Sequence, residues 1–225
     1  MDILNNLLSI KIKNRIKLIQ KGIENPIEHQ EKTLQKNIEI AKNTVFGKEH
    51  QFQKIENYKE FASLVPVRDY NQIKQYVFRA QKKEKNILWP GHIKWFAKSS
   101  GTTQDKSKFI PITDESLKLC HFAAGKDMLA IYLNNHPNSQ ILNGKSLSIG
   151  GSTNINKLQS YYTGDLSAIL IQNLPFWAQL KRVPSMKTAL INDWEKKIQQ
   201  IIEETCNQNI ISISGVPSWT LIILN

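Results

Sequence analysis

Cysteine is nearly absent from this sequence. Its 225 residues include two cysteines, Cys120 and Cys206, and no Cys-x-x-Cys pair. Histidines are also sparse and are scattered along the chain, at positions 29, 50, 92, 121 and 136. A disulfide framework needs paired cysteines and a structural metal site needs clustered ligands. The sequence predicts neither, and we assign no metal-ligating residues.

Long apolar runs are missing as well. No stretch approaches the roughly 20 apolar residues that a membrane-spanning helix needs. The start of the chain, Met1–Leu4, has no basic segment followed by an apolar one, so the sequence predicts no signal peptide and no stable membrane insertion. With so few cysteines, we expect a reduced, cytoplasmic protein.

Acidic residues are too few to balance the basic ones. The chain has 30 Lys and Arg against 19 Asp and Glu, a formal net charge of +11 and a pI near 9.6. The N-terminal lysines alternate with Ile12, Ile16 and Ile19, as on the solvated face of an amphipathic helix. No zinc-finger or RNP-type motif accompanies them, so we expect no nucleic-acid partner. A basic protein that binds nucleic acid or a membrane surface stays open as an alternative.

Helical patterns dominate the first 90 residues. Apolar spacing and capping residues predict helices at 2–21, 26–43, 58–64 and 69–81. Asp69 is placed to cap the last of these, and residues 43–47 are expected to form a turn. We assign residues 1–90 to a helical N-terminal region that packs on the main domain.

The pattern changes at Ile93. Short apolar runs predict strands at 93–97, 109–112, 145–151 and 209–214, and longer periodic segments predict helices at 113–133 and 185–205. Strands that alternate with helices are typical of α/β domains, here with a mostly parallel sheet and flanking helices. We assign residues 91–225 to this α/β domain. Because Trp219–Asn225 opens an apolar helix without capping residues, we expect the fold to be incomplete and the chain truncated.

The segment with the most chemical information joins the predicted strands 93–97 and 109–112. Residues 98–108 read Lys-Ser-Ser-Gly-Thr-Thr-Gln-Asp-Lys-Ser-Lys. Hydroxyls and backbone amides around one glycine form a concavity rich in hydrogen-bond donors, which can wrap phosphate oxygens. Gly101 lets the backbone approach the ligand. A hairpin rich in turn-forming residues is the alternative, and the Gly-x-x-x-x-Gly-Lys-[Ser/Thr] loop of GTPases and kinases is absent.

Ser99–Thr103 followed by the spaced Lys108 resembles the first signature of adenylate-forming enzymes, the superfamily of acyl-CoA synthetases and luciferases. The surrounding blocks are similar to those of the auxin-responsive-promoter family of acyl-acid amido synthetases, and most closely to its bacterial branch. The resemblance covers nearly the whole chain, with blocks at 43–48, 58–61, 65–70, 88–91, 95–103, 147–151, 164–167 and 215–219.

This resemblance implies a two-step ligase. A carboxylate attacks the α-phosphate of ATP to give acyl-AMP and pyrophosphate, and an amine, often an amino acid, then takes the acyl group. ATP and Mg²⁺ are the implied cofactors, and stabilisation of phosphate charge is the implied source of catalysis. The resemblance assigns catalytic roles to Lys108, Thr102 and Thr103. It assigns binding of the ATP phosphates to Ser99, Ser100, Gly101, Thr102, Thr103 and Lys108.

A second candidate site follows the last predicted strand. Ligands of open α/β sheets bind at the carboxyl ends of strands, and here that position holds Gly215, Val216, Pro217, Ser218 and Trp219. In the family that the sequence resembles, this region lies near the active-site cleft, so the resemblance makes these residues a candidate wall of the acyl pocket, with a structural strand-to-helix turn as the alternative.

The resemblance places the residues for adenine, ribose and the mobile lid after Asn225. We therefore expect the full-length protein to be the ligase and this chain alone to be inactive. A non-catalytic module that binds a nucleotide or phosphate is the alternative function.

Overall fold

The computed structural model describes residues 2–99, 108–149, 155–158, 160–215 and 217–224. The chain forms two compact units that combine distant segments. Unit 1 comprises Met1–Leu18, Glu115–Asn156 and Gly164–Asn225, and unit 2 comprises Ile19–Asp114 and Lys157–Thr163. The division into residues 1–90 and 91–225 stays a prediction.

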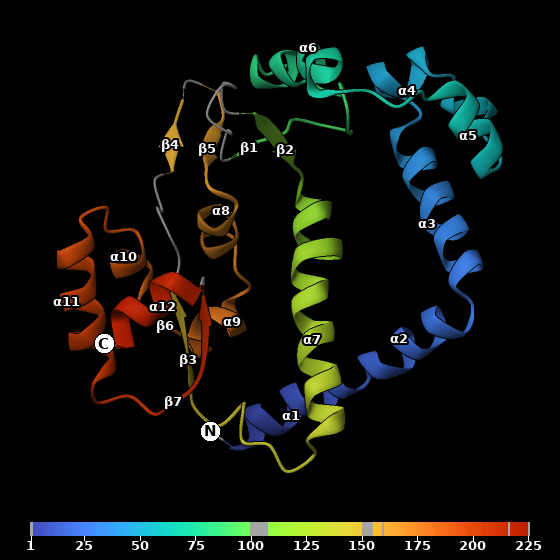
Figure 1. Ribbon diagram of the computed structural model, residues 1–225. Helices are drawn as coiled ribbons and strands as arrows, with labels where there is room; N and C mark the ends of the chain where they lie inside the picture. The colour runs from blue at the N-terminus through green and yellow to red at the C-terminus, as the bar shows by residue number, and fades with distance from the viewer. Residues whose placement is uncertain (1, 100–107, 150–154, 159, 216, 225) are drawn as a thin grey trace. The chain divides into compact units, whose positions relative to one another are not determined.

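The N-terminal part of the chain is helical, as predicted (Figure 1). The elements are α1 (Asp2–Lys13), α2 (Arg15–Glu24), α3 (Pro26–Ala41), α4 (Val45–Glu49), the 3₁₀ turn η1 (Phe52–Lys54), α5 (Tyr58–Leu64) and α6 (Tyr70–Gln81). The single helix expected at 2–21 is wrong, because the chain is interrupted at Asn14 and helix continues past Gly22 to Glu24. The turn expected at 43–47 is shorter, because Thr44 caps α4 by accepting a hydrogen bond from the Gly47 amide.

Caps define the helices that the sequence predicted well. Asn57 accepts a hydrogen bond from the Glu60 amide at the start of α5. Asp69 and Gln72 form a reciprocal capping box at the start of α6. Such pairs satisfy backbone amides that a helix leaves unpaired at its N-terminus. They therefore fix where Tyr70, the first residue of α6, stands.

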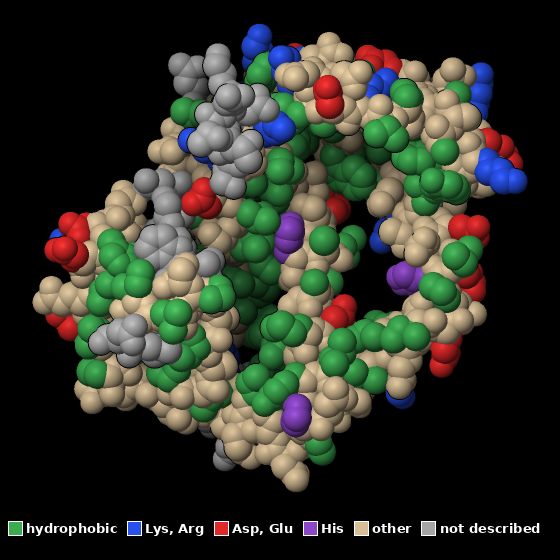
Figure 2. Space-filling model, in the orientation of Figure 1, with side chains coloured by type: hydrophobic (Ala, Val, Ile, Leu, Met, Phe, Trp, Pro, Cys, Tyr) green, Lys and Arg blue, Asp and Glu red, His purple; other side chains and the backbone are tan. Residues whose placement is uncertain are grey.

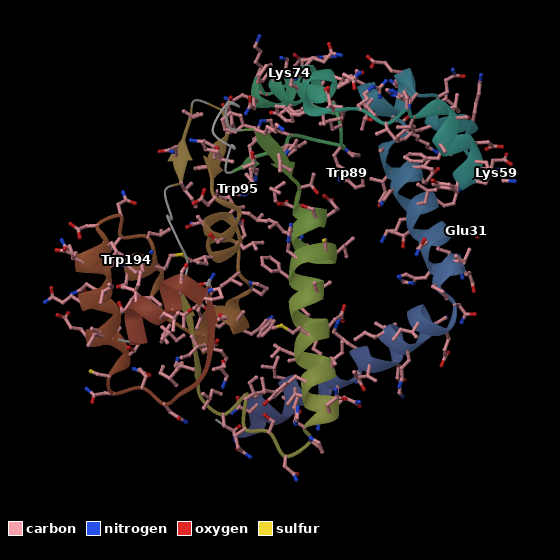
Figure 3. All side chains as sticks on the ribbon, viewed as in Figure 1. Glu31, Lys59, Lys74, Trp89, Trp95 and Trp194 are labelled. Atoms are coloured by element: carbon pink, nitrogen blue, oxygen red, sulfur yellow. The ribbon has the colours of Figure 1, made fainter. Side chains whose placement is uncertain are left out.

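Unit 2 is held together by two hydrophobic clusters. One contains Tyr76, Val77, Ala80, Ile87, Ile93 and Phe96, and the other contains Ile38, Ala41, Phe52 and Ile55. Phe46 and Trp89 pack against both clusters, so they join the helices to the start of the first strand. Lys59 on α5 and Lys74 on α6 lie on the solvent side of their helices (Figure 3).

The first sheet is a small antiparallel hairpin with two further short strands. Strand β1 (Trp95–Lys98) pairs with β2 (Phe109–Ile112) in antiparallel register, with Lys98 opposite Phe109. The sheet continues through β5 (Tyr162–Gly164) to β4 (Asn156–Lys157). One mostly parallel sheet was expected, and the structure has two small sheets, of which this one contains an antiparallel pair. Loop 99–108 is short, and a short connection can join only antiparallel neighbours.

The second sheet, in unit 1, is parallel as predicted. Strand β3 (Lys145–Ile149) lies between β6 (Arg182–Val183) and β7 (Ile210–Gly215), and both pairs are parallel. The helices of unit 1 are the π-helical turn η2 (Ser116–His121), α7 (Phe122–Asn135), α8 (Leu166–Gln172), α9 (Phe176–Lys181), α10 (Met186–Ala189), α11 (Trp194–Thr205) and α12 (Pro217–Leu224). None of the described helices is long and apolar enough to cross a membrane.

The prediction of a single helix at 185–205 is wrong. Ser185 caps α10, and Asp193 caps α11 by accepting a hydrogen bond from the Lys196 amide, so two helices replace one. Figure 3 shows Trp194 at the start of α11. Glu204 on α11 ties the two together by accepting hydrogen bonds from the Ser185 amide at 2.6 Å, the Ser185 hydroxyl at 2.8 Å and the Thr188 hydroxyl.

These bonds make the stability of unit 1 depend on the charge of Glu204. Burial raises the pKa of this carboxyl. Hydrogen bonds from Thr188 and Ser185 and the charge of Arg182 together lower the pKa by more than burial raises it, so the net pKa is below its ordinary value. Stability from this group is therefore present above the unfolded-state pKa, about 4.3, and is lost as pH falls through the folded-state pKa. We expect Glu204→Gln to lower the free energy of unfolding by about 1 kcal/mol at pH 7, with a smaller difference at pH 3, measured by urea denaturation.

Glu203→Gln is the matched control, because Glu203 is the exposed neighbour on the same helix. An equal loss from both variants, or a loss that does not shrink in acid, would contradict the role of the Glu204 charge.

Candidate functional site

The predicted phosphate loop is closed at its base by backbone pairing. The Ser99 amide donates to the Lys108 carbonyl at 2.9 Å, and the Lys108 amide donates to the Ser99 hydroxyl at 3.2 Å. The structure thus brings together the first and last residues of the predicted site. Ser100, Gly101, Thr102 and Thr103 lie outside the described residues, and their assignment stays a prediction.

Tyr70, the first residue of α6, contacts the backbone next to the paired ends of this loop. Its hydroxyl accepts a hydrogen bond from the Phe109 amide at 2.9 Å and lies 3.3 Å from the Phe109 carbonyl. The exposed Lys108 ammonium lies 6.0 Å from the centre of the Tyr70 ring, at the outer edge of the range for a cation–π contact. Tyr70 was missed as a site residue, although it ends one of the family-like sequence blocks.

The segment after β7 is a tight strand-to-helix junction. Gly215 pairs with Ile149 on β3, and a Cβ at Gly215 would lie 2.6 Å from the Ile149 carbonyl oxygen. Only glycine fits such an approach. Pro217 and Ser218 are exposed at the start of α12. Val216 and the Trp219 side chain lie outside what the structure describes, so the acyl-pocket role of this segment stays a prediction.

A cavity of about 550 Å³ lies inside unit 1. This volume is within the usual range of small-molecule sites, roughly 300–1,000 Å³. Its walls are mostly apolar and come from α1, α7, the connection from α8 to α9, and α9 itself. They include Leu8, Phe122, Met128, Leu129, Tyr132, Leu174 and Trp177.

The floor of the cavity is one face of the parallel sheet. Ser146 and Ser148 on β3 stand opposite Ser212 and Ser214 on β7, and all four serines line the cavity. The Ser148 and Ser214 hydroxyls lie 3.2 Å apart. Paired residues share a face of the sheet and neighbours along a strand alternate between faces. Leu147, Ile149 and Val183 accordingly belong to the hydrophobic cluster that includes Ile201 of α11.

Two basic residues line the cavity where α9 meets β6. Lys181 donates to the Asn5 side-chain oxygen and to the Leu142 carbonyl, each at 2.7 Å. Burial lowers the pKa of Lys181, as does the charge of Lys145. Arg182 stands beside Ser146 in the sheet, and its Nε and Nη1 atoms are buried without a hydrogen-bond partner.

Comparison with known proteins decides the family. Residues 15–222 match the GH3 family N-terminal domain. The chain belongs to the GH3 family. This confirms the resemblance to the auxin-responsive-promoter family that the sequence blocks indicated. No curated protein sequence matches the chain at a significant level.

One solved structure supports the fold. A GH3.15 acyl acid amido synthetase matches 94% of this chain with a TM-score of 0.74 at 18% identity, and the match covers 38% of that protein's chain. A second structure, "AtGH3.15 acyl acid amido synthetase in complex with 2,4-DB", matches 87% of this chain and 28% of its own chain, with a TM-score of 0.44 and 20% identity. This GH3 chain thus spans well under half the length of either solved protein.

The cavity residues were not predicted as site residues. Trp177, Arg182 and the four serines were not selected. The available signal was alternation, because Lys-Ser-Leu-Ser-Ile and Ile-Ile-Ser-Ile-Ser each place serines two residues apart. Such alternation predicts a strand with one polar face. It does not show that the polar faces of two separate strands lie on the same side of one sheet.

The Tyr70 hydroxyl gives a direct test of the loop base. We expect Tyr70→Phe to lower the free energy of unfolding by about 1 kcal/mol, because the Phe109 amide loses its acceptor, as measured by urea denaturation. Tyr58→Phe is the control, since the Tyr58 side chain is 66% exposed. Equal stability of the two variants would show that the hydroxyl does not hold the loop base.

Proposed function

We propose that this chain is the N-terminal part of an acyl-acid amido synthetase. The full enzyme activates a carboxylic acid with ATP as acyl-AMP and transfers the acyl group to an amine, such as an amino acid. The observation that carries the proposal is the apolar cavity of about 550 Å³ within a domain of the GH3 family. Its size and lining suit the apolar body of a carboxylic acid.

Loop 99–108 is the proposed site for the ATP phosphates. Bound ATP supplies the AMP group that makes the carboxylate reactive, with pyrophosphate as the leaving group. On this chain, the loop base fits the ligand chemically, since it presents the exposed Lys108 ammonium beside the Ser99 hydroxyl. Lys108 would bind phosphate charge, while Tyr70 and the β1–β2 pairing hold the loop base in place.

Mg²⁺ enters the proposal with the nucleotide. The described residues contain no group of three or more His, Cys, Asp or Glu side chains that could hold a metal ion. We therefore assign the ion to the phosphates of ATP and name no protein ligand for it.

Charged side chains of both signs occur on the face drawn in Figure 2. Figure 2 shows lysine and arginine in several separate places on the viewed face, interspersed with aspartate and glutamate. A nucleic-acid site is expected to concentrate positive charge on one face or along one helix. The proposal names a small carboxylic acid and an amine as partners, in keeping with membership of the GH3 family.

Exchange of radioactive pyrophosphate into ATP tests the first reaction step. We expect acid-dependent exchange by a protein that contains this chain together with the rest of a GH3 enzyme, because adenylation is reversible. The 225-residue chain alone should show none, since orientation of the reacting groups requires the whole nucleotide site. ATP binding without exchange for any of a broad panel of acids would indicate a non-catalytic nucleotide-binding module.

Lys108 and Lys106 provide a matched pair for the loop. We expect Lys108→Ala to weaken ATP binding by about 10-fold or more, because a charge-assisted hydrogen bond contributes roughly 1.5–3 kcal/mol. Lys106→Ala should have a smaller effect. Titration of ATP into each variant measures the difference, and equal effects would place the phosphate contact elsewhere.

A further inference from the structure

His50 is a buried histidine in unit 2, at the C-terminal end of α4. Its ring stacks on the Phe46 ring, with 4.0 Å between the ring centres. The Nδ1 atom lies 2.8 Å from the Phe46 carbonyl oxygen, and the Nε2 atom lies 2.7 Å from the Arg68 Nη1 atom. Each ring nitrogen therefore has a polar partner.

These two partners define where the ring carries its proton. A carbonyl oxygen only accepts hydrogen bonds, and a guanidinium only donates them. Nδ1 therefore donates to Phe46, while Nε2 has no proton and accepts from Arg68. His50 thus serves as an acceptor that holds the Arg68 side chain, which also lies over the Phe46 ring, 5.8 Å from its centre.

Helix α4 joins two parts of unit 2 through these contacts. Its first two amides donate to the carbonyls of residues 86 and 87, in the segment that leads into β1. At its other end, His50 holds Arg68, which lies two positions before Tyr70, the first residue of α6. Helix α4 therefore fixes the start of α6 relative to the segment that leads into β1.

This relative placement matters at the Phe109 amide. Strand β2 is an edge strand of its sheet. The Ser99 amide pairs with the Lys108 carbonyl across the hairpin, so the amide of the next residue, Phe109, points away from β1. The Tyr70 hydroxyl accepts a hydrogen bond from this amide at 2.9 Å. A shift in the start of α6 would remove that acceptor.

We propose that His50 is a positioning residue for the base of the phosphate loop. It acts through Arg68, which holds the start of α6, and through Tyr70, which holds the Phe109 amide beside Lys108. The consequence for ATP rests on the proposed function, but the linkage from His50 to the Phe109 amide does not.

Hydrogen exchange of the Phe109 amide, followed by NMR, tests this linkage without a ligand. We expect His50→Leu to speed the exchange about 10-fold or more, because the variant removes a hydrogen bond to a charged group. His50→Gln should restore most of the protection, since its side-chain oxygen can accept from Arg68. The Ser99 amide should keep its protection in every variant. His29→Leu, at an exposed histidine of α3, is the control.

The ring itself gives a spectroscopic test. Long-range proton–nitrogen NMR of the histidine rings should show His50 with a proton on Nδ1 and none on Nε2. A proton on Nε2 would overturn the inference, because the ring could not then accept from Arg68.

Variants of Arg68 test the second member of the pair. Arg68→Met removes the same hydrogen bond at a less buried position, and it serves if the leucine variant of His50 does not fold. Val67→Ala, at the fully exposed neighbour, is its control. Tyr76 is the competing contact, because its hydroxyl donates to Glu49 of α4. Loss of Phe109 protection in Tyr76→Phe and its retention in Arg68→Met would overturn the assignment.

Titration of ATP separates this inference from the proposed function. We expect His50→Leu to weaken ATP binding by about 3-fold or more, because Lys108 is held less precisely. In a Tyr70→Phe background the same change should have no further effect, and additive losses would overturn the route through Tyr70. Failure of the wild-type protein to bind ATP would overturn the proposed phosphate site. Unchanged Phe109 exchange in both His50→Leu and Arg68→Met would overturn the inference, with or without ATP binding.

Discussion

The site in unit 1 depends on a one-residue shift between two parallel strands. Lys145 stands opposite Ile210, but the next residue, Ser146, stands opposite Ser212. Without the shift, Ser146 would face Ile211, and the serines of β7 would turn toward the hydrophobic cluster, because a slip by one residue exchanges the two faces of a strand. The extra residue in β7 therefore gives the sheet one face of serines and one of aliphatic side chains. The tight packing of Gly144 against Asn209, where an added Cβ would lie 2.4 Å from a carbonyl oxygen, adjoins the shift.

In unit 2, backbone pairing also positions side chains of a predicted site, here at the two ends of loop 99–108. Antiparallel pairing of β1 and β2 brings Ser99 and Lys108 together, although nine positions separate them in sequence. The capping box at Asp69 then fixes the start of α6, which allows the Tyr70 hydroxyl to reach the Phe109 amide. Helix capping is thereby linked to the placement of a predicted ligand-binding residue.

Local signals in the sequence predicted the parts of the fold that local interactions define. Helices α3, α5 and α6 were predicted within two residues because proline, asparagine and the Asp69 capping box mark their starts. Apolar periodicity alone merged α1 with α2 and α10 with α11, since the pattern continues across the interruptions at Asn14 and Asp193. The strands at both ends of loop 99–108 were predicted because each is a contiguous apolar run. The serine floor was not predicted, because it requires the pairing of serines 66 positions apart and a register shift that no single strand contains.

The charge of Glu204 acts on two neighbours in different ways. Its oxygens accept hydrogen bonds from Ser185 and Thr188, which join α10 to α11. The same negative charge raises the pKa of Arg182, while burial lowers it. None of the ion pairs among the described residues includes Arg182, and its buried Nε and Nη1 atoms have no hydrogen-bond acceptor. The carboxylate therefore serves the helix junction by direct contact and the guanidinium only through its charge, so removal of the charge is expected to affect both.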